Sequence, residues 1–271
     1  MRFTDSHCHL DFAEFDQNRT QLLNQCYQQN IRRIVIPSIA PSNWQQVLAL
    51  ATPDNQENKQ PSSPTLFPCL GIHPWFLNDL SESVLEQLNQ LISQHKNEII
   101  AVGEAGIDGA IAKQQGNLTK QQVFFEYQLM LAKQHDLPIV VHHRQSHQWL
   151  APALKIAHLA RGGVIHAFSG SYQQAKQYLD LGFKLGIGGT ISYERAQKTI
   201  KTVKKLPLDC LVLETDAPSM PLAGYQGQAN SPIRLIDVFS HLCQTKQLPS
   251  EMVAEQLEHN IDQLFFDSTS R

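Results

Sequence analysis

Eight short apolar segments alternate with amphipathic segments of helix length, and this alternation constrains the fold more than any other feature. The apolar segments lie near residues 2–7, 34–36, 66–72, 99–104, 138–142, 163–168, 183–187 and 210–216. Helical patterns occupy residues 16–30, 41–51, 81–96, 119–135, 145–160, 172–181 and 194–205, and two more follow at 231–246 and 250–266. Continuous apolar strands separated by helices are typical of a parallel sheet that is covered by helices.

We therefore predict an α/β protein, a (β/α)8 TIM-type barrel with an extra C-terminal helix, in a single domain over residues 1–271. A doubly wound open sheet is the alternative, but no glycine-rich phosphate loop follows the first strand, as a nucleotide-binding version requires. The polar segment 53–65 is expected to be an insertion at the bottom of the barrel. Residues 109–118 are expected to form a loop at the top, where a loop can cover a site.

The composition bounds the environment and the partners. The net charge of −3 gives no general basic field, so any nucleic-acid binding has to be local. Five scattered cysteines without a Cys-x-x-Cys pair indicate a reducing, cytoplasmic compartment. No window approaches the roughly 18 apolar residues of a membrane span, so no membrane association is expected. No obligate protein partner is evident, and we expect a monomer.

Residues that can bind metal ions stand at the ends of the predicted strands. His7 and His9 are two residues apart, so on an extended chain both imidazoles point to one face and can hold one divalent ion. In a barrel the strand ends meet at the top face, where active sites lie. The further candidates at later strand ends are His73, Glu104, His142, Arg144, His166 and Asp216.

Four histidines and two carboxylates in this set exceed the three protein ligands of a catalytic zinc site. They suit two ions about 4 Å apart that share a carboxylate, and Glu104 is the natural bridge because it stands midway in the series. These donors fit zinc, manganese, iron or magnesium and do not choose among them. The plain alternative, a cap on a strand or helix, is reasonable for one such residue and poor for six.

Several motifs in this order resemble the TatD family of metal-dependent deoxyribonucleases and hydrolases. They are Thr4–Asp11, Gly71–Pro74, Gly103–Asp108, Leu137–Pro138 with His142 and Arg144, His166–Gly170 and Leu213–Pro218, and the similarity runs from about residue 3 to 266. Residues 224–232 are most similar to the YjjV-like branch of the family. One departure is Ala105, where the family usually has a larger aliphatic residue, and it removes no ligand.

The resemblance implies a barrel of the amidohydrolase-like group and phosphodiester hydrolysis. The metal ligands that it implies are His7, His9, Glu104, His142, His166 and Asp216. We expect a two-metal phosphodiesterase, a deoxyribonuclease acting on a 3′ end or a single strand, whose substrate is DNA or a small phosphodiester. Zinc, magnesium or manganese would serve, and Glu104 and Asp216 are the expected catalytic residues, Asp216 accepting a proton from the attacking water.

Two residues are candidates for substrate contact. The guanidinium of Arg144 suits phosphate oxygens, and its alternative is a salt bridge to Asp108. His73 is expected to contact a substrate phosphate, with a role at a helix start as the alternative. His143 is expected to point away from His142 and to be structural.

Two carboxylates, Asp5 and Glu214, share the inward phase of the candidate ligands. A carboxylate inside a barrel needs a partner, so we expect each to support a metal-bound histidine or to pair with Lys184.

Two other functions stay open on the sequence alone. A related pair of ions can cleave an amide or ester, such as an aminoacyl ester. A metal-loaded barrel that binds nucleic acid or a partner without turnover is the third hypothesis.

Overall fold

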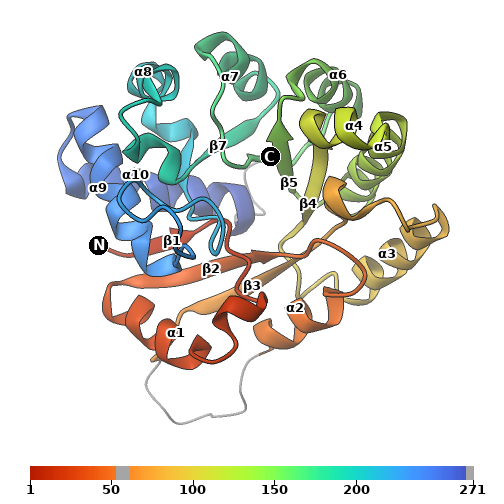
Figure 1. Cartoon of the computed structure of the whole chain (residues 1–271), viewed down its shortest axis with the longest axis horizontal. Coiled ribbons are helices and arrows are strands. Elements are labelled where there is room, and N and C mark those ends of the chain that lie inside the picture. Colours follow the sequence, from red (N-terminus) through yellow and green to blue (C-terminus); the bar gives the residue numbers. More distant parts are fainter. Residues whose placement is uncertain (53–61, 267–271) are drawn as a thin grey trace.

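The computed structural model describes residues 1–52 and 62–266, which form a barrel of parallel strands inside a ring of helices (Figure 1). Neighbouring strands pair in sequence order from β1 to β8. The predicted (β/α)8 barrel is thus confirmed, and the open-sheet alternative is wrong. The strands are β1 (Phe3–Asp5), β2 (Ile31–Pro37), β3 (Thr65–Leu70), β4 (Ala101–Asp108), β5 (Ile139–Arg144), β6 (Gly163–Ile165), β7 (Phe183–Ile187) and β8 (Leu211–Leu213).

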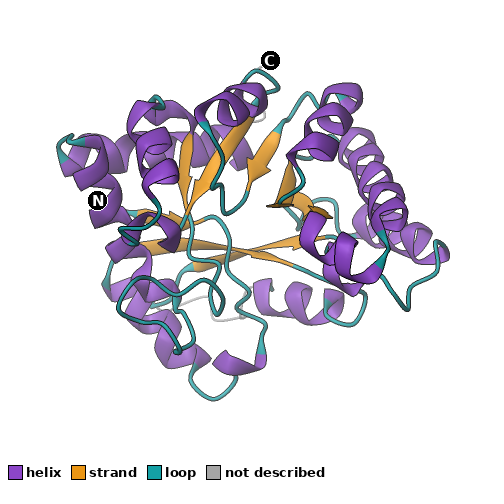
Figure 2. Ribbon diagram, turned by 45° about the horizontal axis from the view of Figure 1, so that its top comes forward, coloured by secondary structure: helices purple, strands orange, loops and turns teal. Residues whose placement is uncertain are grey.

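The helices surround the strands because each buries one apolar face against the outside of the barrel (Figure 2). In α3, for example, Val84, Leu85, Leu88 and Ile92 are buried. The helices are α1 (Arg19–Gln28), α2 (Trp44–Ala51), α3 (Ser83–Gln94), α4 (Gly109–Gln115), α5 (Leu118–His135), α6 (His147–Ala157), α7 (Tyr172–Leu179), α8 (Gln197–Lys205), α9 (Leu235–Lys246) and α10 (Ser250–Ile261). No helix among the described residues is long and apolar enough to cross a membrane.

The chain segments beyond β1 and β8 close the barrel. The amide of Ser6 donates to the carbonyl of Leu213 at 2.9 Å, and the amide of Asp216 donates to the carbonyl of His7 at 2.9 Å. His7 and Asp216 are therefore brought side by side although they are separated by nearly the whole chain.

The lower interior of the barrel is filled by one layer of small apolar side chains. This layer packs against Ile261, Leu264 and Phe265 at the end of α10 and in the π-helical turn that follows it, so the predicted extra C-terminal helix seals the bottom. The layer consists of Val35, Cys69, Ala101, Val140, Val164 and Val212. Since side chains alternate along a strand, residues an even number of positions further on also point inward, at the top. The strand β4 departs from this rule, because its register shifts between Val102 and Ala105, and Glu104 points inward three positions after Ala101.

Two expectations about the connections have different outcomes. The segment 109–118 is not a loop, because α4 begins at Gly109, where Asp108 Oδ1 accepts hydrogen bonds from the amides of Ala110 and Ile111, both at 2.9 Å. Gly116, with φ of 67°, ends this helix. Most of the predicted insertion, residues 53–61, lies outside the described residues.

Candidate metal centre

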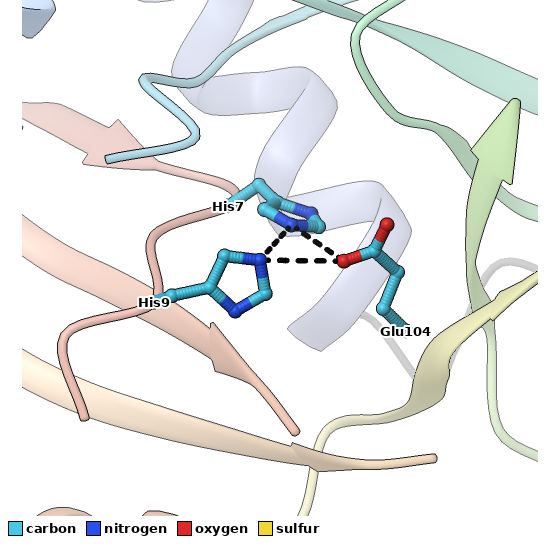
Figure 3. Close-up of side chains that lie close together, drawn as sticks. All are labelled: His7, His9 and Glu104. Carbon is cyan, nitrogen blue, oxygen red and sulfur yellow. Dashed lines mark hydrogen bonds and ion pairs between the residues drawn. The ribbon is translucent and has the colours of Figure 1, made fainter. Parts of the chain in front are cut away.

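Four side chains from beyond β1, from β4 and from beyond β8 converge on one point at the top of the barrel. The Nε2 atoms of His7 and His9 lie 3.2 Å apart. Glu104 Oε2 lies 3.1 Å from His7 Nε2 and 3.4 Å from His9 Nε2 (Figure 3). Asp216 Oδ1 lies 3.6 Å from each of these nitrogens. All four residues are buried.

These distances fit a single divalent ion. Ligand atoms about 2.0–2.2 Å from a tetrahedral ion lie about 3.3–3.6 Å from one another. The three separations among the donor atoms of His7, His9 and Glu104 are 3.2, 3.1 and 3.4 Å, and these residues form a group that could hold a metal ion. Asp216 Oδ1, 3.6 Å from both histidine nitrogens, would complete the ligand set.

The other oxygen of Glu104 faces a second group of donors. Glu104 Oε1 lies 2.8 Å from His142 Nδ1 and 3.6 Å from His166 Nε2. The ring of His166 stacks on that of His7 with centroids 3.8 Å apart, so the two groups are adjacent. Glu104 thus lies between two sets of ligand atoms and offers one oxygen to each.

Asp108, at the end of β4, determines which nitrogen of His142 faces the site. Asp108 Oδ2 lies 3.2 Å from His142 Nε2. Burial alone would raise the pKa of Asp108, but hydrogen bonds from His142 and the Ile111 amide hold it well below its usual value. An ionised carboxylate only accepts, so Nε2 carries the proton and donates it to Asp108. Nδ1 is then the nitrogen that faces Glu104 Oε1, 2.8 Å away, and it would be the ligand atom for an ion beside Glu104.

His73 has the opposite arrangement. Its Nδ1 accepts a hydrogen bond from the backbone amide of Trp75 at 3.1 Å, and burial lowers the pKa of His73 to about 4. The neutral ring therefore carries its proton on Nε2, which lies 3.3 Å from Glu104 Oε1 and 3.1 Å from His142 Nδ1. A protonated nitrogen donates and does not bind a metal ion. His73 is thus a hydrogen-bond donor at the centre, and the same side chain also caps the short helix Pro74–Phe76.

Glu214 stands behind His166. Glu214 Oε1 lies 3.3 Å from His166 Nδ1 and accepts a hydrogen bond of 2.5 Å from the amide of Ala167. This placement directs His166 Nε2 toward Glu104. Gly186 on β7 leaves the space for this carboxylate, because a Cβ atom at Gly186 would overlap the carboxylate oxygens of Glu214.

The family model for TatD-related DNases matches residues 4–266. The chain belongs to the TatD family. It is 43% identical to an uncharacterized metal-dependent hydrolase of Escherichia coli, YjjV, over 97% of this chain and 98% of that protein, and it superposes on the crystal structure of YjjV with a TM-score of 0.89. An uncharacterized metal-dependent hydrolase of Haemophilus influenzae is 38% identical over 98% of this chain and all of that protein.

Similarity of the fold extends further than similarity of the sequence. A TatD family hydrolase of Entamoeba histolytica superposes with a TM-score of 0.83 at 20% identity, covering 98% of both chains. The resemblance to the TatD family, including its YjjV-like branch, is confirmed, and the chain is a metal-dependent hydrolase of this family.

In this TatD centre, the pKa values of the two carboxylates depend on burial and on the histidines that surround them. Burial alone would raise the pKa of Glu104, but His73, His7 and His166 hold it well below its usual value. Burial raises the pKa of Asp216 to about 6, against the opposing effect of His166 and His9. Glu104 is therefore an anion in the free protein.

Asp5 supports the candidate ligand His7, as expected, but through the backbone amide rather than the ring. Its Oδ2 accepts a hydrogen bond of 2.6 Å from the hydroxyl of Thr215, and its Oδ1 accepts from the amides of Thr215 at 3.0 Å and His7 at 3.2 Å. The expected pairing of Asp5 or Glu214 with Lys184 is wrong, since Lys184 Nζ donates to the carbonyl of Asp209 at 2.6 Å. Asp5 thus fixes the segments that carry His7 and Asp216.

The centre opens into a cavity of about 520 Å³, which Arg144 and His73 also line. The half-exposed guanidinium of Arg144 has Nη1 3.5 Å from Asp108 Oδ2, which is the predicted alternative contact, and it still borders the cavity. His143 borders the cavity as well, but its ring packs toward α7, with its centroid 5.6 Å from that of Tyr178, so its structural role stays a prediction.

Sequence reasoning missed the apolar part of the cavity wall. Phe12, Trp75, Phe76 and Met220 line it from the segments that follow β1, β3 and β8. A signal was present in the sequence, because Trp75 and Phe76 directly follow His73-Pro74 at a strand end where the top of the barrel was expected.

Proposed function

We propose that this chain hydrolyses phosphodiester bonds with two divalent ions, and that its substrate is DNA, attacked at a 3′ end or in a single strand, or a small phosphodiester. The observation that carries the proposal is the position of Glu104 between two sets of ligand atoms, one for each of its oxygens. A pair of ions that share a carboxylate suits in-line displacement at phosphorus, where the attacking and the leaving oxygen both need stabilisation.

The side chains have distinct roles in this proposal. Zinc, magnesium or manganese ions, when bound, would lower the pKa of a coordinated water and offset negative charge on the phosphate. His7, His9 and Asp216 hold one side of the centre, and His142 and His166 hold the other. Asp216, with Oδ1 directed at His7 and His9, accepts the proton of the attacking water.

Two groups at the cavity would bind the phosphate itself. Arg144 has a half-exposed guanidinium, whose donors match phosphate oxygens. His73 borders the same cavity, with its Nε2–H 3.3 Å from Glu104 Oε1, and would contact the phosphate beside that carboxylate. Both are neutral or cationic donors, so they favour an anionic group beside the ions.

The cellular setting is part of the proposal. The cysteines are free, which supports a reducing cytoplasmic compartment. We also propose that the protein is a monomer without an obligate protein partner.

The test is hydrolysis of end-labelled single-stranded DNA by the metal-reconstituted protein, with Asp216→Ala prepared identically. We expect stepwise shortening that disappears in the variant. Shortening that persists in the variant would identify a contaminating nuclease and remove the support. No shortening with magnesium, manganese or zinc would exclude DNA, and a panel of small phosphodiesters, amides and aminoacyl esters would then separate the phosphodiesterase from an amide or ester hydrolase.

A second variant tests the proposed phosphate contact. We expect Arg144→Ala to keep its metal content and to raise KM, because the side chain is half exposed and offers no ligand atom. Unchanged kinetics with a full metal content would remove Arg144 from the substrate site.

A further inference from the structure

The two most exposed aromatic rings of the described chain, Trp75 and Phe76, lie at the mouth of the metal centre, and the exposed side chain of Met220 lies there too. Trp75 is 45% exposed, Phe76 is 43% exposed and Met220 is 38% exposed, and all three line the cavity. Phe12 lines it too and stacks on the ring of His9 with centroids 4.8 Å apart. Single exposed apolar residues need no explanation, whereas a group that borders one cavity marks a binding surface.

The indole of Trp75 is held in place. Its Nε1 donates a hydrogen bond of 2.6 Å to Asp108 Oδ2, the oxygen that also accepts from His142. Its ring meets those of His73 and His142 edge to face, with centroids 5.3 Å and 6.2 Å away. An aromatic ring that is fixed before binding loses little conformational entropy when a ligand stacks on it.

We propose that Trp75, with Phe76, Phe12 and Met220 around it, forms a stacking subsite for a nucleobase attached to the phosphodiester that is cleaved. This inference rests on the proposed phosphodiesterase function and names the class of group beside the reacting phosphate. The chemistry of the wall supports it: a flat apolar face suits the faces of a base, and Arg144 on the same cavity suits its phosphate.

Other features of the cavity favour a base over an aliphatic chain. Ser169 and Ser219 carry hydroxyl groups on the same wall, and the polar edge of a base can hydrogen-bond to such groups, whereas a lipid chain cannot. The volume of about 520 Å³ is in the range of small-molecule sites, about 300–1,000 Å³. A base with its phosphate would contact the ring of Trp75, the serine hydroxyls and the guanidinium of Arg144 at the same time.

The experiment compares a thymidine dinucleotide with two analogues, each of which lacks one base and keeps the phosphodiester. For each protein the readout is the base advantage, the ratio of kcat/KM with and without the base. Stacking of one base predicts an advantage of about 10- to 100-fold for the wild type at one of the two positions. Trp75→Leu should reduce it to within about threefold, since stacking is the interaction that is lost.

Two further variants separate stacking from structure. Trp75→Phe keeps a ring but loses the hydrogen bond to Asp108, and it should retain most of the base advantage. Tyr172→Leu, at an exposed aromatic residue on α7 outside the cavity wall, should retain all of it. A base advantage that survives in Trp75→Leu, or one that is absent in the wild type while the dinucleotide is cleaved, would overturn the inference.

A binding measurement keeps this inference distinct from the proposed hydrolysis. In metal-loaded Trp44→Phe/Trp149→Phe protein, Trp75 is the remaining tryptophan. Thymidine 5′-monophosphate should quench its fluorescence saturably, and deoxyribose 5-phosphate should not. If no phosphodiester is cleaved but this difference is found, the proposed hydrolysis fails and the base subsite stands. Equal responses to both ligands would reject the subsite whatever the hydrolysis shows.

Discussion

Replacing Asp108 by asparagine tests whether this carboxylate prepares His142 to bind an ion. Asp108 Oδ2 faces the Nε1–H of Trp75 at 2.6 Å and the Nε2–H of His142 at 3.2 Å, with Arg144 Nη1 at 3.5 Å. An amide NH₂ in that place would put donor against donor. His142 would then move its proton to Nδ1, the nitrogen that faces Glu104, and an ion would have to displace that proton.

The opposite orientation of the asparagine amide is unfavourable as well. It would return an oxygen to His142 but turn the NH₂ toward the amides of Ala110 and Ile111, and losing that helix cap costs about 1 kcal/mol. Loss of a partner behind a ligating histidine typically costs 10–100-fold in metal affinity. We therefore expect Asp108→Asn to weaken one ion by about 1.4–2.7 kcal/mol.

The measurement is calorimetric titration of the metal-free protein with zinc or manganese, analysed for two sites. One site of Asp108→Asn should weaken by the stated amount while the other stays within about threefold of wild type. Asp11→Asn is a matched control, because Asp11 is also a buried acid at the top but hydrogen-bonds Asn43, with 2.8 Å between Asn43 Nδ2 and Asp11 Oδ2. Wild-type affinity at both sites of Asp108→Asn would refute the assignment of the His142 nitrogens.

Three further predictions follow from the same contacts. Glu104→Ala should lose both ions in a metal analysis of the purified protein, because each ligand set includes one of its oxygens; retention of one ion per chain would contradict the bridge. Gly186→Ala should displace Glu214 from His166 and weaken one ion by about 10-fold or more in the same titration, and an unchanged affinity would show that Glu214 does not orient the ring. In the native protein at pH 8 we expect Ellman's reagent to modify at most one thiol per chain, that of the half-buried Cys243. The reason is that burial raises the pKa of all five thiols, for example that of Cys26 to about 12. Rapid reaction of four or five thiols would contradict this packing.

The alternation of side chains made much of the centre predictable. Val140 and His142 lie two residues apart on β5, and Val164 precedes His166 by two at the end of β6, so a histidine at the top shares the phase of an apolar residue in the barrel interior. Two rules suffice for this prediction: side chains alternate between the two faces of a strand, and the carboxyl ends of the strands meet at the top of a barrel. Both rules follow from the geometry of strands and barrels, so they apply to a sequence without its structure.

His143 follows the same rule on the opposite face. By alternation it points away from His142, toward the helices. Its ring lies 5.6 Å from that of Tyr178 on α7 and 6.4 Å from that of His147 on α6, centroid to centroid. The period of two therefore separates the two neighbouring histidines of β5, although β5 pairs with β6 only as far as Val141.

The helix α4 and the role of Asp108 were beyond sequence reasoning for a related reason. The segment Gly109–Gln115 begins with glycine, a poor helix former, and shows no long apolar stripe. The helix forms because the carboxylate of Asp108 caps its first turn, and Asp108 can do so only because β4 ends there. Helix propensities do not show where β4 ends, because the pairing of β4 with β5 sets that position.

One strand, β4, therefore supplies both carboxylates on which the centre depends, and each divides its two oxygens between two tasks. Glu104 gives one oxygen to each ligand set. Asp108 gives Oδ1 to the start of α4 and Oδ2 to His142 and Trp75. The helix cap is what makes the second task possible, since it fixes the carboxylate while leaving Oδ2 directed at the site. A shift of β4 by one residue would turn both acids to the outer face. The register of this strand therefore determines both the position of Glu104 between the two sets of ligand atoms and the contact of Asp108 with His142.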